Sequence, residues 1–365
     1  MSSFPLLLGV ELAGTGAHRS SWRRADSRAE ELFTAGYWLD AISAVDRAGF
    51  DLAFLPDTFG VGSESAGATG GFGPIDAVAV AARAATSTHT LGLIPQATVT
   101  HTEPFHVSKA IAALDYATSG RGGWEVGVSH GADQAALFGR KGVQDDRSLW
   151  HEADEAIEVV RRLWDSWEDD AEIRDLPTGR FIDRDRLHYI DFEGTNFSVK
   201  GPSITPRPPQ GQPPIAVRAE TPAATRVAVH RADLIRVSAP DLASAAVERT
   251  RLRTAVAAAG RMPDEVRILL DLEVHLASSE STAQADVEQL DNWAAAPPSG
   301  VRYIGTTAGL RDLFEQCRRE CAADGVVLRP LAVAAFTAQL ARPLRTVRAR
   351  LGLSRPGSRY ATARG

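Results

Sequence analysis

The sequence lacks long apolar runs, a cysteine framework and an excess of basic residues, and each absence narrows the possible functions. No stretch of the 365 residues approaches eighteen consecutive apolar residues, so no membrane span is expected. Two cysteines are too few for a disulfide scaffold, and no signal-like segment is found near the N-terminus, so we expect a cytoplasmic location. The net charge of −6 argues against a nucleic-acid partner, which would more often require a basic surface.

Several catalytic motifs are missing as well. The chain contains no GxGxxG, HExxH or HxH pattern, which argues against a dinucleotide fold and a metal hydrolase. No metal site is therefore predicted. A glycosidase would need two facing carboxylates, and Asp57 together with Glu103, Glu125 or Glu220 remains an alternative source of such a pair.

What the chain does contain is an alternation of short β-like runs with longer helical patterns. This alternation is typical of βαβ units around a parallel sheet. A count of eight predicted strands favours a (β/α)₈ TIM barrel over an open doubly wound sheet, which would show a similar alternation. The predicted strands are Leu6–Leu12, Asp51–Leu55, Thr90–Pro95, Gly122–Val128, Pro214–Ala219, Leu234–Val237, Val266–Val274 and Gly325–Leu328.

The helices between these runs carry apolar stripes at helical spacing. The longest stripe consists of Ala153, Ile157, Val160, Trp164 and Trp167. Cys317 and Cys321 lie four residues apart in another helical pattern, in line with neighbouring apolar residues. We interpret them as two small residues on a buried face, with half of a metal site as the alternative.

A single α/β barrel domain over residues 1–365 is predicted, with insertions. Gly60–Gly73 is rich in glycine and serine and is interpreted as a flexible lid. A hairpin insertion is expected near 165–198, and Ser203–Pro214 is rich in proline and predicts a rigid connector. The basic C-terminal tail 342–365 is expected to pack across its own barrel or a neighbouring subunit.

Candidate site residues follow the predicted strands, because TIM-barrel chemistry lies at the carboxyl ends of the strands. The residues there are mostly hydroxyls and histidines, a set that suits an anionic and largely planar ligand such as a flavin, among others. His18 and His101 are candidates for the pocket, although no catalytic residue is predicted. The residues at the strand ends are Gly14, Thr15, Gly16, His18, Asp57, Thr98, Thr100, His101, Thr102, Ser129, His130, Arg218, Glu220 and Thr221.

Longer segments resemble a known family, in order and over nearly the whole chain. They include GTGAHRSSWRRADS, LFTAGYWLDAISAVDRAGFDLAFLPD, TEPFHVSKAIAALDYATSGRGGWEV and YIGTTAGLRDLF. These segments are similar to bacterial-luciferase-like flavin monooxygenases, in the branch of nitrilotriacetate and dibenzothiophene-sulfone monooxygenases. The resemblance implies a luciferase-like barrel that uses reduced FMN from a separate flavin reductase, together with O₂, to oxidise a small organic substrate. It also implies a homodimer or homo-oligomer.

The resemblance assigns part of the flavin site to residues of this chain. Asp57, Thr100 and Ser129 match family positions beside the flavin. Thr102 stands where the family has a flavin-contacting asparagine, and Glu125 also replaces an asparagine. The chain is shorter than its relatives between residues 292 and 305, where the family carries a long insertion over the pocket.

The phosphate end of the implied flavin site departs further from the family. Trp150 replaces a phosphate-binding tyrosine, and the family's phosphate turn appears as Arg218 to Thr221 with one residue deleted. Glu220 places a carboxylate in that turn, and Arg218 is the predicted counter-cation. The predicted FMN contacts are therefore Asp57, Thr100, Thr102, Ser129, Trp150, Arg218 and Thr221. Two alternatives follow from the departures: a barrel that has lost FMN binding and acts as a partner subunit, or an F420-dependent oxidoreductase.

Overall fold

The computed structural model describes residues 6–60 and 75–340 of the chain. Nearly all of the predicted lid Gly60–Gly73, and the tail 342–365, lie outside the described residues. Eight parallel strands form a closed barrel in the circular order β1-β2-β3-β4-β9-β10-β11-β13, which confirms the predicted fold class. Their bounds are β1 Leu7–Glu11, β2 Leu52–Leu55, β3 Gly92–Thr98, β4 Trp124–Gly127, β9 Ile215–Arg218, β10 Leu234–Val237, β11 Arg267–Leu276 and β13 Gly325–Pro330.

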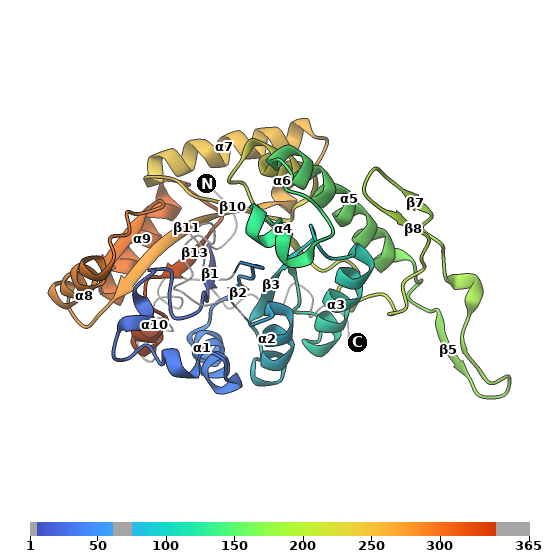
Figure 1. Cartoon of the computed structure of the whole chain (residues 1–365), viewed down its shortest axis with the longest axis horizontal. Helices are drawn as coiled ribbons and strands as arrows, with labels where there is room; N and C mark the ends of the chain where they lie inside the picture. The colour runs from blue at the N-terminus through green and yellow to red at the C-terminus, as the bar shows by residue number, and fades with distance from the viewer. Residues whose placement is uncertain (1–5, 61–74, 341–365) are drawn as a thin grey trace.

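The helices surround the strands as an outer ring (Figure 1). They are α1 Ala35–Ala48, α2 Ala77–Ala84, α3 Pro104–Ala117, α4 Ala132–Phe138, α5 Asp146–Asp165, α6 Pro222–Arg231, α7 Leu242–Ala258, α8 Glu280–Trp293, α9 Thr307–Arg319 and α10 Val333–Leu340. Short 3₁₀ turns occupy Ser21–Arg23, Ala29–Glu31, Ala85–Ser87, Arg184–Arg186 and Pro263–Glu265. In the described ranges, no helix is long and apolar enough to cross a membrane.

The longest helix shows how local sequence sets an element's ends. Asp145 begins α5 by accepting a hydrogen bond from the backbone N–H of Ser148 at 2.7 Å, the usual role of an N-cap carboxylate. The apolar stripe of α5 packs inward as predicted, but the helix ends at Asp165. Trp167 therefore lies past the helix rather than on it. Its indole N–H donates to the backbone oxygen of Ser203 at 2.7 Å, which fixes the proline-rich connector.

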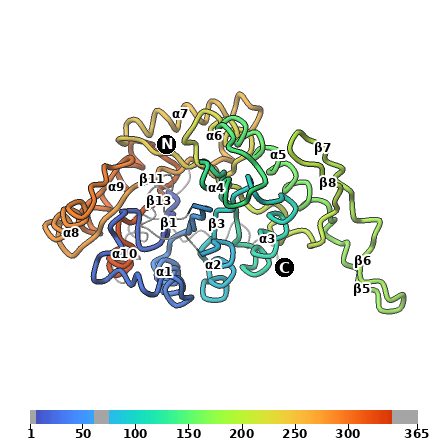
Figure 2. The backbone as a smooth tube through the Cα atoms, viewed as in Figure 1, coloured from blue at the N-terminus to red at the C-terminus, as the bar shows by residue number. Residues whose placement is uncertain are grey.

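Two features extend the barrel. Strand β12, Arg302–Gly305, pairs in parallel with Glu273–Leu276, the far half of the long strand β11. The predicted insertion near 165–198 contains two hairpins rather than one, β5–β6 (Glu172–Asp175 and Arg180–Ile182) and β7–β8 (Phe192–Glu193 and Ser198–Val199). Figure 2 shows that the β5–β6 hairpin projects away from the barrel as an arm.

The barrel interior is divided into an apolar layer and a charged layer. Side chains that face inward alternate along each strand, because successive residues of a strand point to opposite faces. The layer nearer the amino ends of the strands is apolar and comprises Phe54, Ile94, Ala216, Leu234, Leu269 and Val327. The next inward-facing positions, two residues further towards the carboxyl ends of the strands, carry charged side chains. They are Glu11, Glu125, Arg218, Arg236, Asp271 and Arg329.

Candidate functional site

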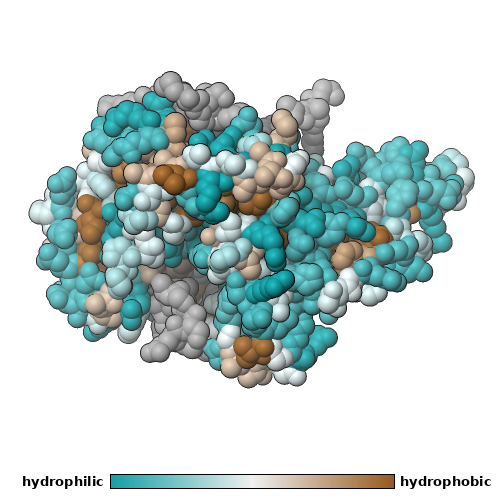
Figure 3. Space-filling view, turned by 90° about the horizontal axis from the view of Figure 1, so that it is seen from above, coloured by the Kyte–Doolittle hydropathy of each residue, from teal (hydrophilic) through white to brown (hydrophobic). Residues whose placement is uncertain are grey.

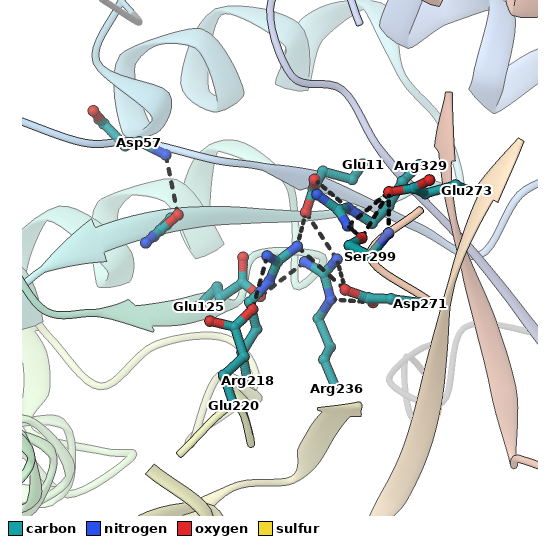
Figure 4. Close-up of polar contacts among 11 residues, drawn as sticks. Glu11, Asp57, Glu125, Arg218, Glu220, Arg236, Asp271, Glu273, Ser299 and Arg329 are labelled. Carbon is teal, nitrogen blue, oxygen red and sulfur yellow. Dashed lines mark hydrogen bonds and ion pairs between the residues drawn. The ribbon is translucent and has the colours of Figure 1, made fainter. Parts of the chain in front are cut away.

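Arg236 is the centre of the charged layer (Figure 4). Its guanidinium is fully buried and donates to Glu11 at 2.8 Å, to Glu125 at 2.9 Å and to both oxygens of Asp271 at 2.9 Å. The guanidinium carbon also lies 4.5 Å from the centre of the Phe54 ring, so the charged layer rests on the apolar one. Burying this many charges is tolerable only because each has hydrogen-bonded partners of opposite sign.

Arg218, predicted as the cation that offsets Glu220 and as an FMN contact, belongs to the same cluster. Its guanidinium contacts Glu11 and lies 3.3 Å from Asp271 and 3.5 Å from Glu125. A further ion pair of 3.4 Å joins Arg218 to Glu220. Carboxylates of the protein itself therefore surround Arg218, and it offsets the charge of Glu220 within the fold.

The second half of β11 ties the segment 292–305 to this layer. Glu273 accepts hydrogen bonds from the Ser299 hydroxyl at 2.6 Å and from Arg302 at 2.7 Å. Arg329 donates to Ser299 at 3.0 Å and to Glu11 at 3.1 Å. This loop is consequently fixed against the mouth of the barrel by charged and hydroxyl groups.

The protonation of these carboxyl groups differs with their surroundings. Burial opposes the ionisation of Glu11, but Arg218, Arg236 and Arg329 outweigh it and hold the pKa of Glu11 well below its ordinary value. For Glu125, burial outweighs the attraction of Arg236 and Arg218, and the pKa of this carboxyl is raised. At the end of β2, burial raises the pKa of Asp57 to about 6. The Asp57 carboxyl accepts from the backbone N–H of Ala77 at 2.9 Å.

A second polar group lies past the ends of β3 and β4, around Thr100. The Thr100 hydroxyl accepts a hydrogen bond from the backbone N–H of Ser129 at 2.9 Å. Lys141 donates to the Thr100 backbone oxygen at 2.7 Å and forms an ion pair with Glu152 of α5. The structure thus joins two predicted contacts, Thr100 and Ser129, to Lys141 and Glu152, which sequence reasoning missed. The available signal was Glu152, an acidic residue on the otherwise apolar inner face of α5.

Three buried polar atoms around Thr100 have no hydrogen-bond partner among the described residues. They are the Ser129 hydroxyl oxygen, the Oε2 atom of Glu152 and the Nδ1 atom of His101. Ser129 is 7% exposed and Glu152 only 1%. Buried polar groups in native proteins are nearly always paired, so such a cluster indicates the place where a polar ligand binds.

An aromatic wall borders this cluster. The His101 ring stacks on Phe138 with a centroid distance of 4.4 Å, and Phe59 packs edge-on against Phe138 at 4.7 Å. Burial lowers the pKa of His101, and the neighbouring Lys141 lowers it further, which favours the neutral ring. The wall therefore presents apolar surface and one neutral imidazole to the same space.

The remaining predicted residues are engaged within the fold. Both ring nitrogens of buried His18 have partners, the backbone N–H of Ser20 at 3.1 Å and Asp291 at 3.2 Å. The Thr102 hydroxyl donates to the Thr98 backbone oxygen. Trp150 is 6% exposed and packs in the main apolar core.

The turn at the start of α6 offers few donors for a phosphate. Pro222 opens the helix and has no N–H group. The hydroxyl of Thr221 already accepts from the backbone N–H of Ala224 at 3.1 Å. With the carboxylate of Glu220 in the same turn, this helix N-terminus has fewer free N–H groups and a weaker positive field than a helix start that ordinarily holds a phosphate.

Comparisons with known proteins identify a family for this chain and solved structures with the same barrel fold. The family model described as luciferase-like monooxygenase matches residues 15–354. N-acetyl-S-(2-succino)cysteine monooxygenase of Bacillus subtilis is 32% identical over 307 residues, which cover 84% of this chain and 69% of that protein. Dibenzothiophene-sulfone monooxygenase of Rhodococcus erythropolis is 31% identical over 313 residues, which cover 83% of this chain and 69% of that protein. The crystal structure of a long-chain alkane monooxygenase superposes with a TM-score of 0.85 at 20% identity, covering 98% and 94% of the two chains, and shows the shared fold.

Proposed function

Because the chain belongs to the luciferase-like monooxygenase family, we propose that it is the oxygenase component of a two-component flavin monooxygenase. A separate flavin reductase supplies reduced FMN. With reduced FMN bound, one atom of O₂ enters a small organic substrate, the other leaves as water, and the flavin is oxidised to FMN. Turnover tests begin with the compounds named in the relatives, N-acetyl-S-(2-succino)cysteine, dibenzothiophene sulfone and nitrilotriacetate.

The observation that carries the proposal is the group of unpaired buried atoms at Ser129, Glu152 and His101. A flavin ring has carbonyl and N–H groups along one edge and an apolar face. The unpaired hydroxyl, carboxylate and imidazole supply both donors and acceptors for such an edge. The stacked rings of His101 and Phe138 supply an apolar wall for such a face.

The other residues of the site hold these groups in place. Lys141 joins the backbone at Thr100 to α5 through Glu152, so the loop after β3 cannot move independently of that helix. The charged layer fills the barrel beneath the mouth with paired side chains, most of them buried. Asp57, whose pKa is about 6, gains or loses a proton near neutral pH at the adjacent strand end.

Anaerobic titration with reduced FMN tests the proposal. We expect reduced FMN to raise the melting temperature of the protein, because a ligand that binds only the folded state stabilises it. Ser129→Ala and Thr100→Val should each weaken binding by about ten-fold, the loss expected for one hydrogen bond to a buried partner. The control is Thr250→Val, whose hydroxyl bonds the Ala246 backbone oxygen on its own helix.

Two results would contradict the proposal, and a third would contradict the role of Thr100 and Ser129 in binding. Stabilisation by F420 and not by FMN would favour the deazaflavin alternative. No stabilisation by either would favour a partner subunit without a flavin. Equal loss of FMN binding in Thr250→Val would show that the effects at Thr100 and Ser129 arise from general destabilisation.

A further inference from the structure

The three buried carboxyl groups around Arg236 share the guanidinium groups of the charged layer unequally (Figure 4). Glu11 is paired with three guanidinium groups. Asp271 accepts hydrogen bonds from Arg236 on both of its oxygens, each at 2.9 Å. Glu125 accepts a single hydrogen bond, from Arg236 at 2.9 Å, and the Arg218 guanidinium lies 3.5 Å away. Glu125 therefore has the least compensation for a negative charge.

Both guanidinium groups approach the same oxygen of Glu125. The contacts with Arg236 and Arg218 are made by Oε1, whereas Oε2 accepts no hydrogen bond from any residue that the structure describes. An ionised carboxylate buried with one oxygen unbonded is unfavourable, because hydrogen bonds must replace the water that burial removes. A carboxylic acid instead carries its proton on such an oxygen and becomes a donor there. The contacts thus favour a neutral Glu125 with the proton on Oε2.

The other carboxylates of the layer act in the same direction. Glu11 and Asp271 share Arg236 with Glu125, and their negative charges oppose a third one beside them. Burial raises the pKa of Glu125, Arg236 and Arg218 oppose the rise, and Glu11 and Asp271 add to it. The pKa of Glu11 is lowered instead, because three arginines act on it. The layer therefore holds an ionised and a neutral glutamate side by side.

The charged layer is accessible from the barrel mouth. The side chain of Arg218 is 25% exposed and that of Arg329 is 14% exposed, although Arg236 beneath them is fully buried. A ligand in the mouth of a TIM barrel lies at the carboxyl ends of the strands, which is the end nearest this layer. The unbonded Oε2 of Glu125 therefore belongs to the layer that such a ligand would meet.

The proposed reaction consumes a proton when the reduced flavin enters as its anion. Substrate, O₂, the reduced FMN anion and one H⁺ are converted to oxygenated substrate, oxidised FMN and water. A neutral carboxyl group at this end of the barrel can supply the proton, because a general acid acts from its protonated form.

We infer that Glu125 is an uncharged carboxylic acid in the native protein at pH 7 and that it donates its proton to the reaction at the barrel mouth. The identity of that reaction rests on the proposed function. The O–H bond at Oε2 breaks, the proton enters the water that oxygenation releases, and Glu125 remains as a carboxylate bonded to Arg236. A proton from solvent restores the acid before the next turnover.

Infrared spectroscopy of the flavin-free protein at pH 7 tests the protonation itself. A carboxylic acid has a C=O stretching band distinct from those of carboxylates, and part of this band should be lost in Glu125→Gln and kept in the control Glu193→Gln, an exposed residue of β7. Glutamine resembles the neutral acid in shape, so Glu125→Gln should change the melting temperature by less than about 2 °C. Glu11→Gln removes an ionised partner of three arginines and should lower it by about 5 °C or more. No loss of the acid band in Glu125→Gln, or equal destabilisation by the two changes, would overturn the inference.

Turnover with reduced FMN tests the donation. Glu125→Gln cannot release a proton and should lower kcat by about 100-fold or more, the range of a general acid, with little change in the affinity for reduced FMN. Glu125→Asp should recover part of the rate, and Glu193→Gln should keep all of it. In wild-type protein kcat should fall as the pH rises and Glu125 ionises, and this fall should be absent in Glu125→Gln.

An unchanged kcat in Glu125→Gln would overturn the donation even where the infrared band shows a neutral Glu125. Parallel losses of kcat and of reduced FMN affinity would show a role in binding and also overturn it. Failure of wild-type protein to bind reduced FMN contradicts the proposed function, and with it the donation step, while the infrared band still decides whether Glu125 is neutral.

Discussion

At the residue scale, Arg236 is the position on which the barrel interior depends most. Replacing it with methionine would leave Glu11, Glu125 and Asp271 buried with one fewer counter-charge. We expect Arg236→Met to lower the free energy of unfolding by about 3–5 kcal/mol, as breaking a buried ionic cluster does. Urea denaturation measures this loss. The matched surface change Arg318→Met should cost less than about 0.5 kcal/mol, and a loss equally small at Arg236 would mean that water reaches the cluster.

Asp57 gives a pH dependence whose sign follows from its pKa. The folded-state pKa of about 6 lies above the ordinary value of 3.8, so the native protein holds this proton more tightly than the unfolded chain. The resulting stability is present below about pH 3.8 and is lost as the pH rises through 6. Asp57→Asn should therefore gain stability relative to wild type between pH 4 and 6 and keep a constant difference above that range. Urea denaturation at a series of pH values measures it, and a flat difference would contradict the raised pKa.

Sequence reasoning at this scale could find residues that follow strand ends, but it could not tell which side chains face the barrel axis. Thr100 and Ser129 were predicted as flavin contacts past the ends of two adjacent parallel strands, and a hydrogen bond joins them. Arg218 was predicted as the cation beside Glu220; it pairs with Glu220, and it also points inward to Glu11, which was not foreseen. Which face of a strand is inward depends on the register around the closed barrel. A single strand such as LIRV does not carry that information.

At the element scale, the end of α9 separates the two cysteines. The helix ends at Arg319, so Cys317 is buried within it, while Cys321 lies beyond it, half-buried, with φ +52°. Burial raises the pKa of the Cys317 thiol to about 12. We expect a thiol reagent to modify Cys321 and spare Cys317 in the native protein, since the thiolate is the reactive form. The variant Cys321→Ala should then show no reaction until it is unfolded, and a reacting Cys317 would reveal opening of α9.

The ends and extent of elements were harder to predict than their existence. All eight barrel strands were predicted, because each is a short apolar run bounded by turn residues. The predicted stripe of α5 extended to Trp167, yet the helix ends at Asp165 and that indole binds the connector instead. Strands β5 and β6 were missed because their residues are mostly charged and show no apolar alternation.

At the scale of the whole molecule, the barrel and its arm differ in what stabilises them. The barrel has an apolar interior layer and an apolar core between strands and helices. The arm has little of either: Figure 3 shows the projecting part of the molecule as largely hydrophilic. Leu176 and Phe181 of the arm are 91% and 59% exposed. The fold class was predictable from the strand count, but the arm's projection depends on contacts that no local pattern encodes.

The arm should therefore be the least protected strand pair of the described protein in solution. Among the described strands β5 pairs with β6 and with no other, and a lone two-stranded hairpin is marginally stable in water. We expect hydrogen exchange at Glu172–Ile182 to be orders of magnitude faster than in β11, whose ten residues are all buried. The hydrogen bond from Asp183 N–H to the Ala171 oxygen, 2.8 Å, closes the base of the hairpin. A short glycine–serine link in place of residues 173–181 should then change the unfolding free energy by less than about 1 kcal/mol.

Strong protection of the arm from hydrogen exchange, with a large loss of stability on its removal, would contradict this independence. It would instead place the exposed Leu176 and Phe181 in a contact with a second copy, and the mass of the shortened protein in solution would fall accordingly.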